Sequence, residues 1–414
     1  MGHSENLTLA LREARAHTDE LFRLVCPGAL YDRPIPERHR IIFYLGHLEA
    51  FDWNLVSGHA LRPGSFHPEF DRLFAFGIDP PPGQLPCDEP RDWPSVAEVE
   101  QYNRGTRQAI DGVLGELPER LLHVAIEHRL MHAETFAYIL HSLPYEKKVR
   151  PEPGAPAVGA GSLTGTAPRH PGQTPPPVAA PGTATASAPR HRMLEIAAGP
   201  AMLGLAPGER FGWDNEFQAH AVDVPAFSIG KYKVTNGQYL EFVRQGAAPP
   251  FYWRDRAGQW FYRGMFEEIP LPPDCPVYVT HCEAQAYAEW RGMRLPSEAE
   301  FHRAAATAGV SCNVDFRHWD PIPVTADDDA GDIASPRQLV GNGWEWTATV
   351  FAPFPGFQPF PFYTNYSAPF FDGAHYVLKG GSPRTAARLL RPSFRNWFRP
   401  EYPYVYATFR MVER

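Results

Sequence analysis

Apolar residues recur with helical spacing along residues 121–144, and the rest of the chain can be organised around this stretch. In LLHVAIEHRLMHAETFAYILHSLP the apolar side chains stand three or four positions apart, which is typical of a helix packed on one face. Pro144 marks the C-terminal end, because proline cannot continue a helix. The stretch also carries His128 and His132, whose spacing puts both imidazoles on one face, one turn apart.

Three segments before this stretch show the same helical period. One of them begins with a capping box, in which Ser95 can cap the helix and Glu98 stands three residues on. The segment 62–94, rich in Pro, Gly and Asp, is expected to be a long loop. Four helices of this length predict an up-and-down bundle that fills residues 1–148. The predicted helices cover residues 5–25, about 36–58, about 95–117 and 121–144.

The pattern changes twice after the bundle. Residues 149–192 are mostly Pro, Ala, Gly, Thr and Ser, so they cannot bury enough apolar surface to order themselves, and we expect a flexible linker. Residues 193–414 are rich in Gly and aromatic residues, with short β-like runs such as FSIGKYKVT and HYVLKGG. The sequence therefore predicts a multidomain protein, an all-α four-helix bundle followed by an irregular α+β domain. Short helices are expected in that domain at 235–245, 280–291 and 294–305.

Composition and charge exclude some classes of function. The 414 residues are 43% hydrophobic and 21% charged, an ordinary composition with ample material for cores. A net charge of −8 provides no electrostatic footprint for nucleic acid or an anionic membrane. We find neither an apolar run of transmembrane length nor a signal pattern at the N-terminus. The five cysteines are scattered without a CxxC pair, which favours a reduced, cytoplasmic protein.

His47, in the second predicted helix, suggests a metal site together with His128 and His132. Three neutral imidazoles from two helices can hold one ion and leave coordination positions open, as a catalytic metal requires. The alternative is that the pair in the last helix is merely solvated or capped. Glu134 completes an HxxxHxE string, but it lies about 200° around the helix from His132, so we expect it to support the site or an interhelical contact rather than bind the metal.

Both halves contain motifs of known families. The first half resembles the DinB-like metal-binding bundle through His47 and the HxxxHxE string. The second half resembles the formylglycine-generating-enzyme/sulfatase-modifying-factor family, whose fold is related to C-type lectins. The motifs that carry this second resemblance are KYKVTNGQYLEFV at 231–243, RLPSEAEFHRAA at 294–305, GNGWEWT at 341–347, LKGGS at 378–382 and TFR at 408–410.

Together, the two domains in this order resemble the iron-dependent sulfoxide synthases of ergothioneine biosynthesis and their selenoneine-making relatives. The resemblance implies Fe(II) held by His47, His128 and His132. It implies hercynine, the trimethylated betaine of histidine, as the acceptor. It also implies an oxygen-dependent step that joins sulfur or selenium to C2 of the imidazole.

The same resemblance assigns roles around the expected cleft. In the Y-x-x-Y-S segment, Tyr363 matches the family's proton donor and Tyr366 a contact to hercynine. A phenol can supply a proton or a hydrogen atom, although packing within its aromatic run is the simpler explanation of Tyr363. Asn396 can hydrogen-bond the substrate, and Trp397 offers a π face to a quaternary ammonium.

Three departures from the family pattern concern the donor. Phe398 stands where the γ-glutamylcysteine-using branch carries Asp, Met131 where it carries Gln, and Pro383 where it carries Trp. Without the Asp, the α-amino group of an amino-acid thiol loses an acceptor. The sequence thus favours a selenoneine synthase with a selenosugar donor, and an ergothioneine-type synthase using cysteine or γ-glutamylcysteine is the alternative.

Other classes of function were weighed against this one. Formylglycine-generating oxidases need a reactive cysteine pair near the C-terminus, and no cysteine follows Cys312. A lectin-like binding module fused to a bundle would not require three histidines together with the Tyr-x-x-Tyr-Ser segment. A zinc-dependent thiol transferase also suits three histidines. The expected partners are small molecules, namely hercynine, a selenosugar or thiol donor and O2, with no nucleic acid or membrane.

Overall fold

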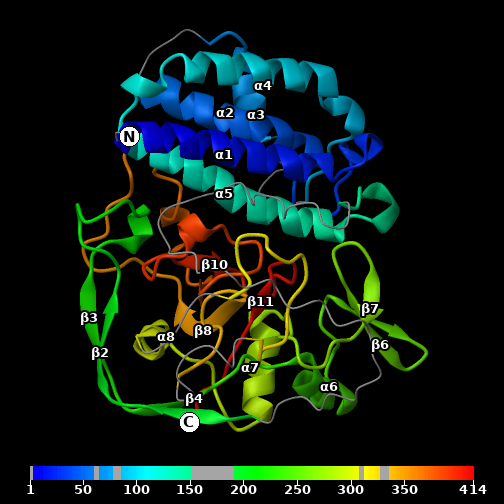
Figure 1. Ribbon diagram of the computed structural model, residues 1–414, viewed down its shortest axis with the longest axis vertical. Helices are drawn as coiled ribbons and strands as arrows, with labels where there is room; N and C mark the ends of the chain where they lie inside the picture. The colour runs from blue at the N-terminus through cyan, green and yellow to red at the C-terminus, as the bar shows by residue number, and fades with distance from the viewer. Residues whose placement is uncertain (1–2, 60–64, 78–84, 152–190, 307–311, 327–334) are drawn as a thin grey trace, which may run out of the picture.

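Helices fill the first half of the chain and short strands dominate the second half. The computed structural model describes residues 3–59, 65–77, 85–151, 191–306, 312–326 and 335–414. Most of the predicted linker therefore lies outside the described residues, and its bounds stay a prediction. In Figure 1 the helices of the first half form a layer over the strands of the second half, and α5 is the helix nearest to them. The helices of the first layer are α1 (His3–Arg23), α2 (Ile41–His59), α3 (Pro68–Phe76), α4 (Val96–Asp111) and α5 (Glu119–Ser142).

The four long helices confirm the predicted bundle, but the expectation of one long loop over 62–94 is wrong, because α3 lies within it. Pro68 occupies the start of α3, where its missing N–H costs nothing, and the His67 side chain accepts a hydrogen bond from a backbone N–H of the first turn. The Asp71 carboxylate accepts a 3.0 Å hydrogen bond from the indole of Trp53 on α2. Contacts with neighbouring helices thus stabilise a short helix that its Pro-rich surroundings conceal.

The second half is an irregular α+β domain, as predicted. Its largest sheet has four strands in the order β10-β9-β8-β11, in which β8 pairs antiparallel with β9 and parallel with β11. A three-stranded sheet β5-β6-β7 and two strand pairs, β1-β4 and β2-β3, surround it. The elements are β1 (Met193–Ile196), β2 (Gly199–Leu203), β3 (His220–Val224), β4 (Phe227–Gly230), α6 (Asn236–Arg244), β5 (Trp253–Arg256), β6 (Gln259–Arg263), β7 (Glu268–Pro270), α7 (His281–Trp290), α8 (Glu298–Ala305), β8 (Trp344–Val350), β9 (Tyr376–Lys379), β10 (Asn396–Phe398) and β11 (Ala407–Thr408).

Capping boxes begin the three helices of this domain, at Thr235, Thr280 and Ser297. In each box the hydroxyl of the cap residue accepts a hydrogen bond from the backbone N–H three residues on. The side chain of that later residue accepts one from the backbone N–H of the cap residue. The predicted start of the third helix at 294 is four residues early, because Ser297 is the cap and α8 begins at Glu298.

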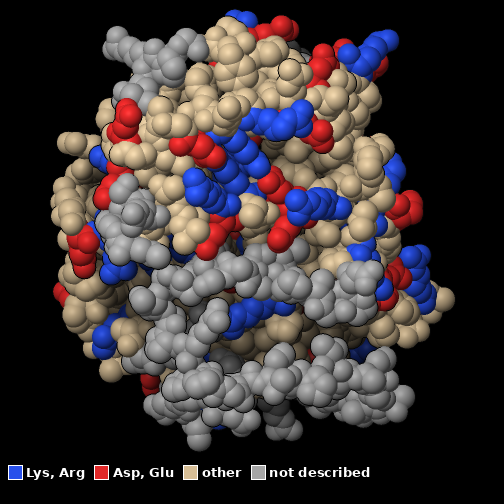
Figure 2. Space-filling view, turned by 45° about the horizontal axis from the view of Figure 1, so that its top comes forward, with Lys and Arg blue, Asp and Glu red and all other residues tan. Residues whose placement is uncertain are grey.

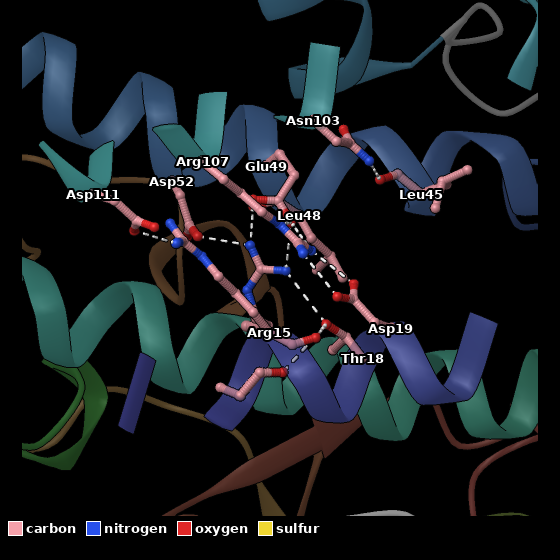
Figure 3. A network of polar contacts seen from close by, with 12 residues as sticks. Arg15, Thr18, Asp19, Leu45, Leu48, Glu49, Asp52, Asn103, Arg107 and Asp111 are labelled. Carbon is pink, nitrogen blue, oxygen red and sulfur yellow. Dashed lines mark hydrogen bonds and ion pairs between the residues drawn. The ribbon is translucent and has the colours of Figure 1, made fainter. Parts of the chain in front are cut away.

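Buried charge joins the helices of the bundle to one another. Arg129 of α5 donates to Glu49 at 3.0 Å and to Asp52 at 2.7 Å, both on α2. Arg107 of α4 donates to the same Glu49 at 2.7 Å and to Asp19 of α1 (Figure 3). Burial alone would raise the pKa of Glu49, but the two guanidinium groups hold it at about 2. This network fixes α5 in place relative to α2.

One hydrophobic core continues from the bundle into the second domain. Leu122 and Ile126 of α5 belong to the same cluster of buried side chains as Trp213 and Trp344. On the face seen in Figure 2, basic and acidic side chains lie interspersed rather than gathered by sign. No helix among the described residues is both long enough and apolar enough to cross a membrane.

Candidate metal centre and substrate cavity

Two helices bring the three predicted histidines together. His47 comes from α2, and His128 and His132 come from α5, with candidate ligand atoms all within 4.8 Å of one another. The Nε2 atoms of His47 and His132 lie 3.3 Å apart. Two nitrogens that each bind one ion at about 2.1 Å are separated by about 3.0 to 3.4 Å, depending on coordination geometry. The spacing therefore fits a shared metal ion.

Helix α3 sets the orientation of His47. The Nδ1 atom of His47 lies 2.7 Å from the Phe74 carbonyl oxygen. A carbonyl can only accept, so Nδ1 carries the hydrogen and Nε2 keeps a free lone pair, the form that binds a metal. Gly46 permits the close approach of α3, because a Cβ at this position would lie 2.5 Å from the Phe74 ring.

Burial keeps all three imidazoles neutral at physiological pH. It lowers the pKa of His47 to about 4 and those of His128 and His132 well below the usual value. The ring of His128 stacks on Phe51 at a centroid distance of 3.4 Å. The buried Nδ1 atoms of His128 and His132 have no hydrogen-bond partner among the described residues. Neutral imidazoles with unused nitrogens are a donor set that fits iron or zinc.

A cavity of about 440 Å³ opens onto His128 and His132. Its wall contains residues from both halves of the chain, which joins the predicted metal site to the predicted substrate site. His47 stands behind this cavity and lines a neighbouring one together with Phe51 and Tyr363. The other predicted site residues that line the first cavity are Met131, Tyr363, Tyr366, Asn396, Trp397 and Phe398.

Tyr363 lies at the edge of the histidine cluster. Its ring centroid is 5.4 Å from that of Phe51 and 6.4 Å from that of His128. Its hydroxyl makes no hydrogen bond to a described residue. Burial raises the pKa of Tyr363 to about 12, so the phenol keeps its proton at neutral pH.

Aromatic rings form the wall around Tyr366 and Trp397. Tyr366 stacks on Trp213 at 4.0 Å, and its hydroxyl donates to the sulfur of Met131 at 3.4 Å. Trp397 meets Tyr366 edge-on at 5.4 Å, and one face of its indole stacks on Phe351 at 4.3 Å. The cavity thus presents π surfaces close to the histidines.

Asn396 and Phe398, the neighbours of Trp397 on strand β10, extend this wall. The Asn396 side-chain oxygen accepts a 2.9 Å hydrogen bond from the backbone N–H of Trp397. Phe398 stacks on Tyr402 with ring planes 11° apart and centroids 5.2 Å apart. Arg38, which the sequence did not single out, also lines the cavity and donates to the Tyr402 hydroxyl at 2.9 Å.

Glu134 faces the second domain, in agreement with the expectation that it is not a metal ligand. Its buried carboxylate accepts from the Trp344 indole at 2.7 Å and from the hydroxyls of Ser382 at 2.6 Å and Thr385 at 2.7 Å. Trp344 belongs to the GNGWEWT motif and Ser382 to LKGGS. The carboxylate therefore holds the helix that carries His128 and His132 against two motifs of the second domain.

Glu127 is a second buried carboxylate with this role, and the sequence analysis missed it. It accepts from the Trp213 indole at 2.9 Å and from both terminal nitrogens of Arg391 at 2.9 Å. Trp213 is the ring on which Tyr366 stacks, so Glu127 supports the cavity wall. A signal was present in the sequence, since Glu127 stands seven residues before Glu134 on one helix.

Comparison with known proteins matches both halves to families. Residues 10–141 match the DinB superfamily, and residues 179–325 and 335–414 match the sulfatase-modifying factor enzyme 1-like domain. The "Hercynine oxygenase" of Mycolicibacterium thermoresistibile is 32% identical over 87% of this chain and 83% of its own length. That of Mycolicibacterium smegmatis is 32% identical over 87% of each. "Ergothioneine biosynthesis protein 1" of Schizosaccharomyces pombe is 28% identical over 94% of this chain, which spans 54% of it.

The fold and the site define a two-part protein in which a DinB-type bundle precedes a sulfatase-modifying-factor domain. With relatives at this identity over most of its length, the chain belongs to the enzyme family that contains the hercynine oxygenases.

Proposed function

We propose that the chain is an Fe(II)- and O2-dependent enzyme that joins selenium or sulfur to C2 of the hercynine imidazole, with a selenosugar as its preferred donor. The observation that carries the proposal is the single cavity onto which His128, His132, Tyr363 and Trp397 all open. Iron held by His47, His128 and His132 would supply the site at which dioxygen is activated.

The proposed reaction balances with dioxygen as its oxidant. A donor R–XH, in which X is selenium or sulfur, loses its X–H hydrogen, and hercynine loses the hydrogen at C2. The new C–X bond accounts for two electrons and oxidation of X to the selenoxide or sulfoxide for two more. One oxygen atom enters the product and the other leaves as water.

The aromatic wall supports hercynine as the acceptor. A trimethylammonium group cannot donate a hydrogen bond, so it is recognised by π faces, and Trp397 and Tyr366 provide such surfaces. The amide of Asn396 is available to the carboxylate or the imidazole of the same molecule. These residues would orient C2 toward the histidine cluster.

Tyr363 is suited to donate a proton or a hydrogen atom in the oxygen-dependent step. The pKa of about 12 keeps the phenol protonated before the reaction. The lack of a described partner leaves its hydroxyl free to turn toward a reacting group. Its ring position beside Phe51 and His128 keeps it at the edge of the proposed iron site.

Phe398 favours a donor without an ammonium group over an amino-acid thiol. The ammonium group of γ-glutamylcysteine would need a charged partner in the cavity, because an unpaired buried ion costs several kcal/mol. A sugar ring can instead lie against aromatic side chains, and Phe398 and Tyr402 form a stacked pair in the cavity wall. A selenol is ionised at neutral pH, whereas a thiol mostly is not, which favours selenium.

Anaerobic reconstitution tests the proposal. The protein is loaded with Fe(II), hercynine is added, and air is admitted with each donor in turn while oxygen uptake and product mass are followed. We expect oxygen consumption and a product whose mass is that of hercynine plus donor plus one oxygen atom minus two hydrogens. Product formation without oxygen uptake would instead indicate zinc-type thiol transfer, and hercynine binding without turnover would indicate a binding module.

A competition experiment tests the donor separately. The selenosugar and γ-glutamylcysteine are supplied at equal concentration with hercynine saturating. We expect the selenosugar product to dominate by at least about tenfold, which is the effect of about 1.4 kcal/mol in transition-state binding. Faster use of γ-glutamylcysteine would instead indicate that the chain is an ergothioneine-type synthase.

A further inference from the structure

Arg38 is a cation of the cavity wall with no carboxylate partner among the described residues. It lies just before α2, the helix that carries His47, and it is half-buried. Its Nε donates to Tyr402 at 2.9 Å and one terminal nitrogen donates to Tyr138 at 2.7 Å. Its other terminal nitrogen, Nη1, makes no hydrogen bond to a described residue. The side chain therefore keeps donors for a further partner.

The other arginines of the cavity wall are already paired. Arg395 forms an ion pair with Glu298 at 3.0 Å, and Arg399 lies 3.7 Å from Asp372. Arg38 differs from both, because its two partners are neutral phenols. A guanidinium stays charged at every relevant pH, so a partly buried one without a counter-charge favours binding of an anion.

Two tyrosines from different halves of the chain hold this guanidinium in position. Tyr138 belongs to α5, six residues after His132, and Tyr402 follows β10. The centre of the guanidinium lies 5.6 Å from the Tyr138 ring and 5.3 Å from the Tyr402 ring. Because Tyr402 also stacks on Phe398, the arginine is continuous with the wall that carries Trp397. A side chain held in this way is preorganised for a ligand.

We propose that Arg38 binds a substrate carboxylate in this cavity, and that this carboxylate belongs to hercynine. The inference rests on the proposed function. A guanidinium matches a carboxylate because two parallel N–H groups can bond its two oxygens. Hercynine carries a carboxylate as well as a cation, whereas a sugar donor carries no carboxylate. The aromatic face of Trp397 then recognises the ammonium end and Arg38 recognises the carboxylate end.

A binding experiment with an altered substrate tests this assignment. Iron-loaded protein, kept anaerobic, is titrated calorimetrically with hercynine and with its decarboxylated analogue, the trimethylammonium derivative of histamine. We expect Arg38→Met to weaken hercynine binding about 10- to 100-fold, the effect of losing charge-assisted hydrogen bonds, and to change binding of the analogue less than about twofold. Arg104→Met, which removes an exposed arginine of α4 outside this cavity, is the control and should leave both affinities unchanged.

The outcomes separate this inference from the function on which it rests. Equal weakening of hercynine and analogue would overturn it, because a disturbed cavity affects both ligands alike. Unchanged hercynine binding in Arg38→Met would overturn it as well, and weakened binding of γ-glutamylcysteine in that variant would assign the carboxylate to the donor. Failure of the wild-type protein to bind hercynine would overturn the proposed function itself.

Discussion

At the scale of single residues, the surroundings of the histidine cluster combine a phenol that keeps its proton with imidazoles that stay neutral. Tyr363 keeps its hydrogen because burial raises its pKa to about 12. His47 loses its charge because burial lowers its pKa to about 4. Burial raises the pKa of the phenol and lowers the pKa of the imidazole, because in each case it disfavours the charged form. A proton donor and free nitrogen lone pairs can therefore coexist beside one cavity at neutral pH.

Substitution of Tyr363 by Phe should separate binding from reaction. The aromatic packing against Phe51 is retained, so hercynine affinity should stay within about threefold of wild type, while product formation should fall about 100-fold or more, the usual effect of removing a general acid. Calorimetry gives the affinity and product mass gives the rate. Unchanged product formation would remove Tyr363 from the mechanism.

Substitution of His132 by Ala should abolish stoichiometric iron binding. Two remaining imidazoles cannot replace the third ligand whose Nε2 lies 3.3 Å from that of His47. Metal content after Fe(II) loading and desalting, with circular dichroism for the fold, provides the measurement. Glu134→Gln is the control and should keep its iron, and full occupancy in His132→Ala would refute the ligand assignment.

At the scale of elements, α5 has two functions on two faces. Glu127 and Glu134 are seven residues apart and lie within about 20° of each other around the helix, whereas His128 and His132 are about 100° to 140° away from Glu127. One face carries the histidines of the proposed metal site, and the adjacent face contacts the second domain. The helix thereby fixes the distance between the proposed iron site and the aromatic wall.

Loss of the Glu134 carboxylate should destabilise the whole protein. Glu134→Ala leaves the donors of Trp344, Ser382 and Thr385 buried without their acceptor, and we expect the free energy of unfolding to fall by about 2 to 4 kcal/mol. Glu134→Gln keeps one side-chain acceptor and should cost less. Denaturant unfolding of both variants measures the difference, and equal stability of Glu134→Ala and wild type would contradict this role.

Local signals made the long helices and the histidine cluster predictable. Helical period and the Ser95 capping box are encoded within a few residues, and His128 and His132 meet because four residues make about one turn. The resemblance to known families supplied the residues of the aromatic wall. Arg38 could not be predicted, because Tyr402, its partner, stands 364 residues away. Helix α3 was missed because its nine residues lie in a segment rich in Pro, Gly and Asp, and its contacts with α2 and α4 are not visible in the sequence.

At the scale of the whole molecule, a buried histidine at the contact between the two domains makes the stability of the protein depend on pH. His17 of α1 packs edge-on against Phe316 of the second domain at 4.4 Å. Neither ring nitrogen of His17 has a hydrogen-bond partner among the described residues. Burial lowers the pKa of His17 to about 4. The folded protein therefore holds this side chain neutral at pH values where the unfolded chain protonates it.

Stability should fall as the pH falls from about 6.5, the usual histidine pKa, toward the His17 value of about 4. Within this window the unfolded state binds more protons, so His17 alone accounts for a loss of about 3 kcal/mol that is absent above the window. His17→Leu should unfold with a shallower dependence on pH. Urea unfolding at several pH values measures this, and identical slopes for variant and wild type would contradict it.

The carboxylates that tether α5 also restrict how such enzymes can be recombined. A chimera that joins this bundle to the second domain of a relative would carry Glu127 and Glu134, but the new domain need not contain their hydrogen-bond donors. In this chain the donors are Trp213, Arg391, Trp344, Ser382 and Thr385. Such a hybrid would keep its three histidines but would hold them in a different position relative to the aromatic wall. The proposed donor preference is therefore better tested by point changes around Phe398 than by exchange of entire modules.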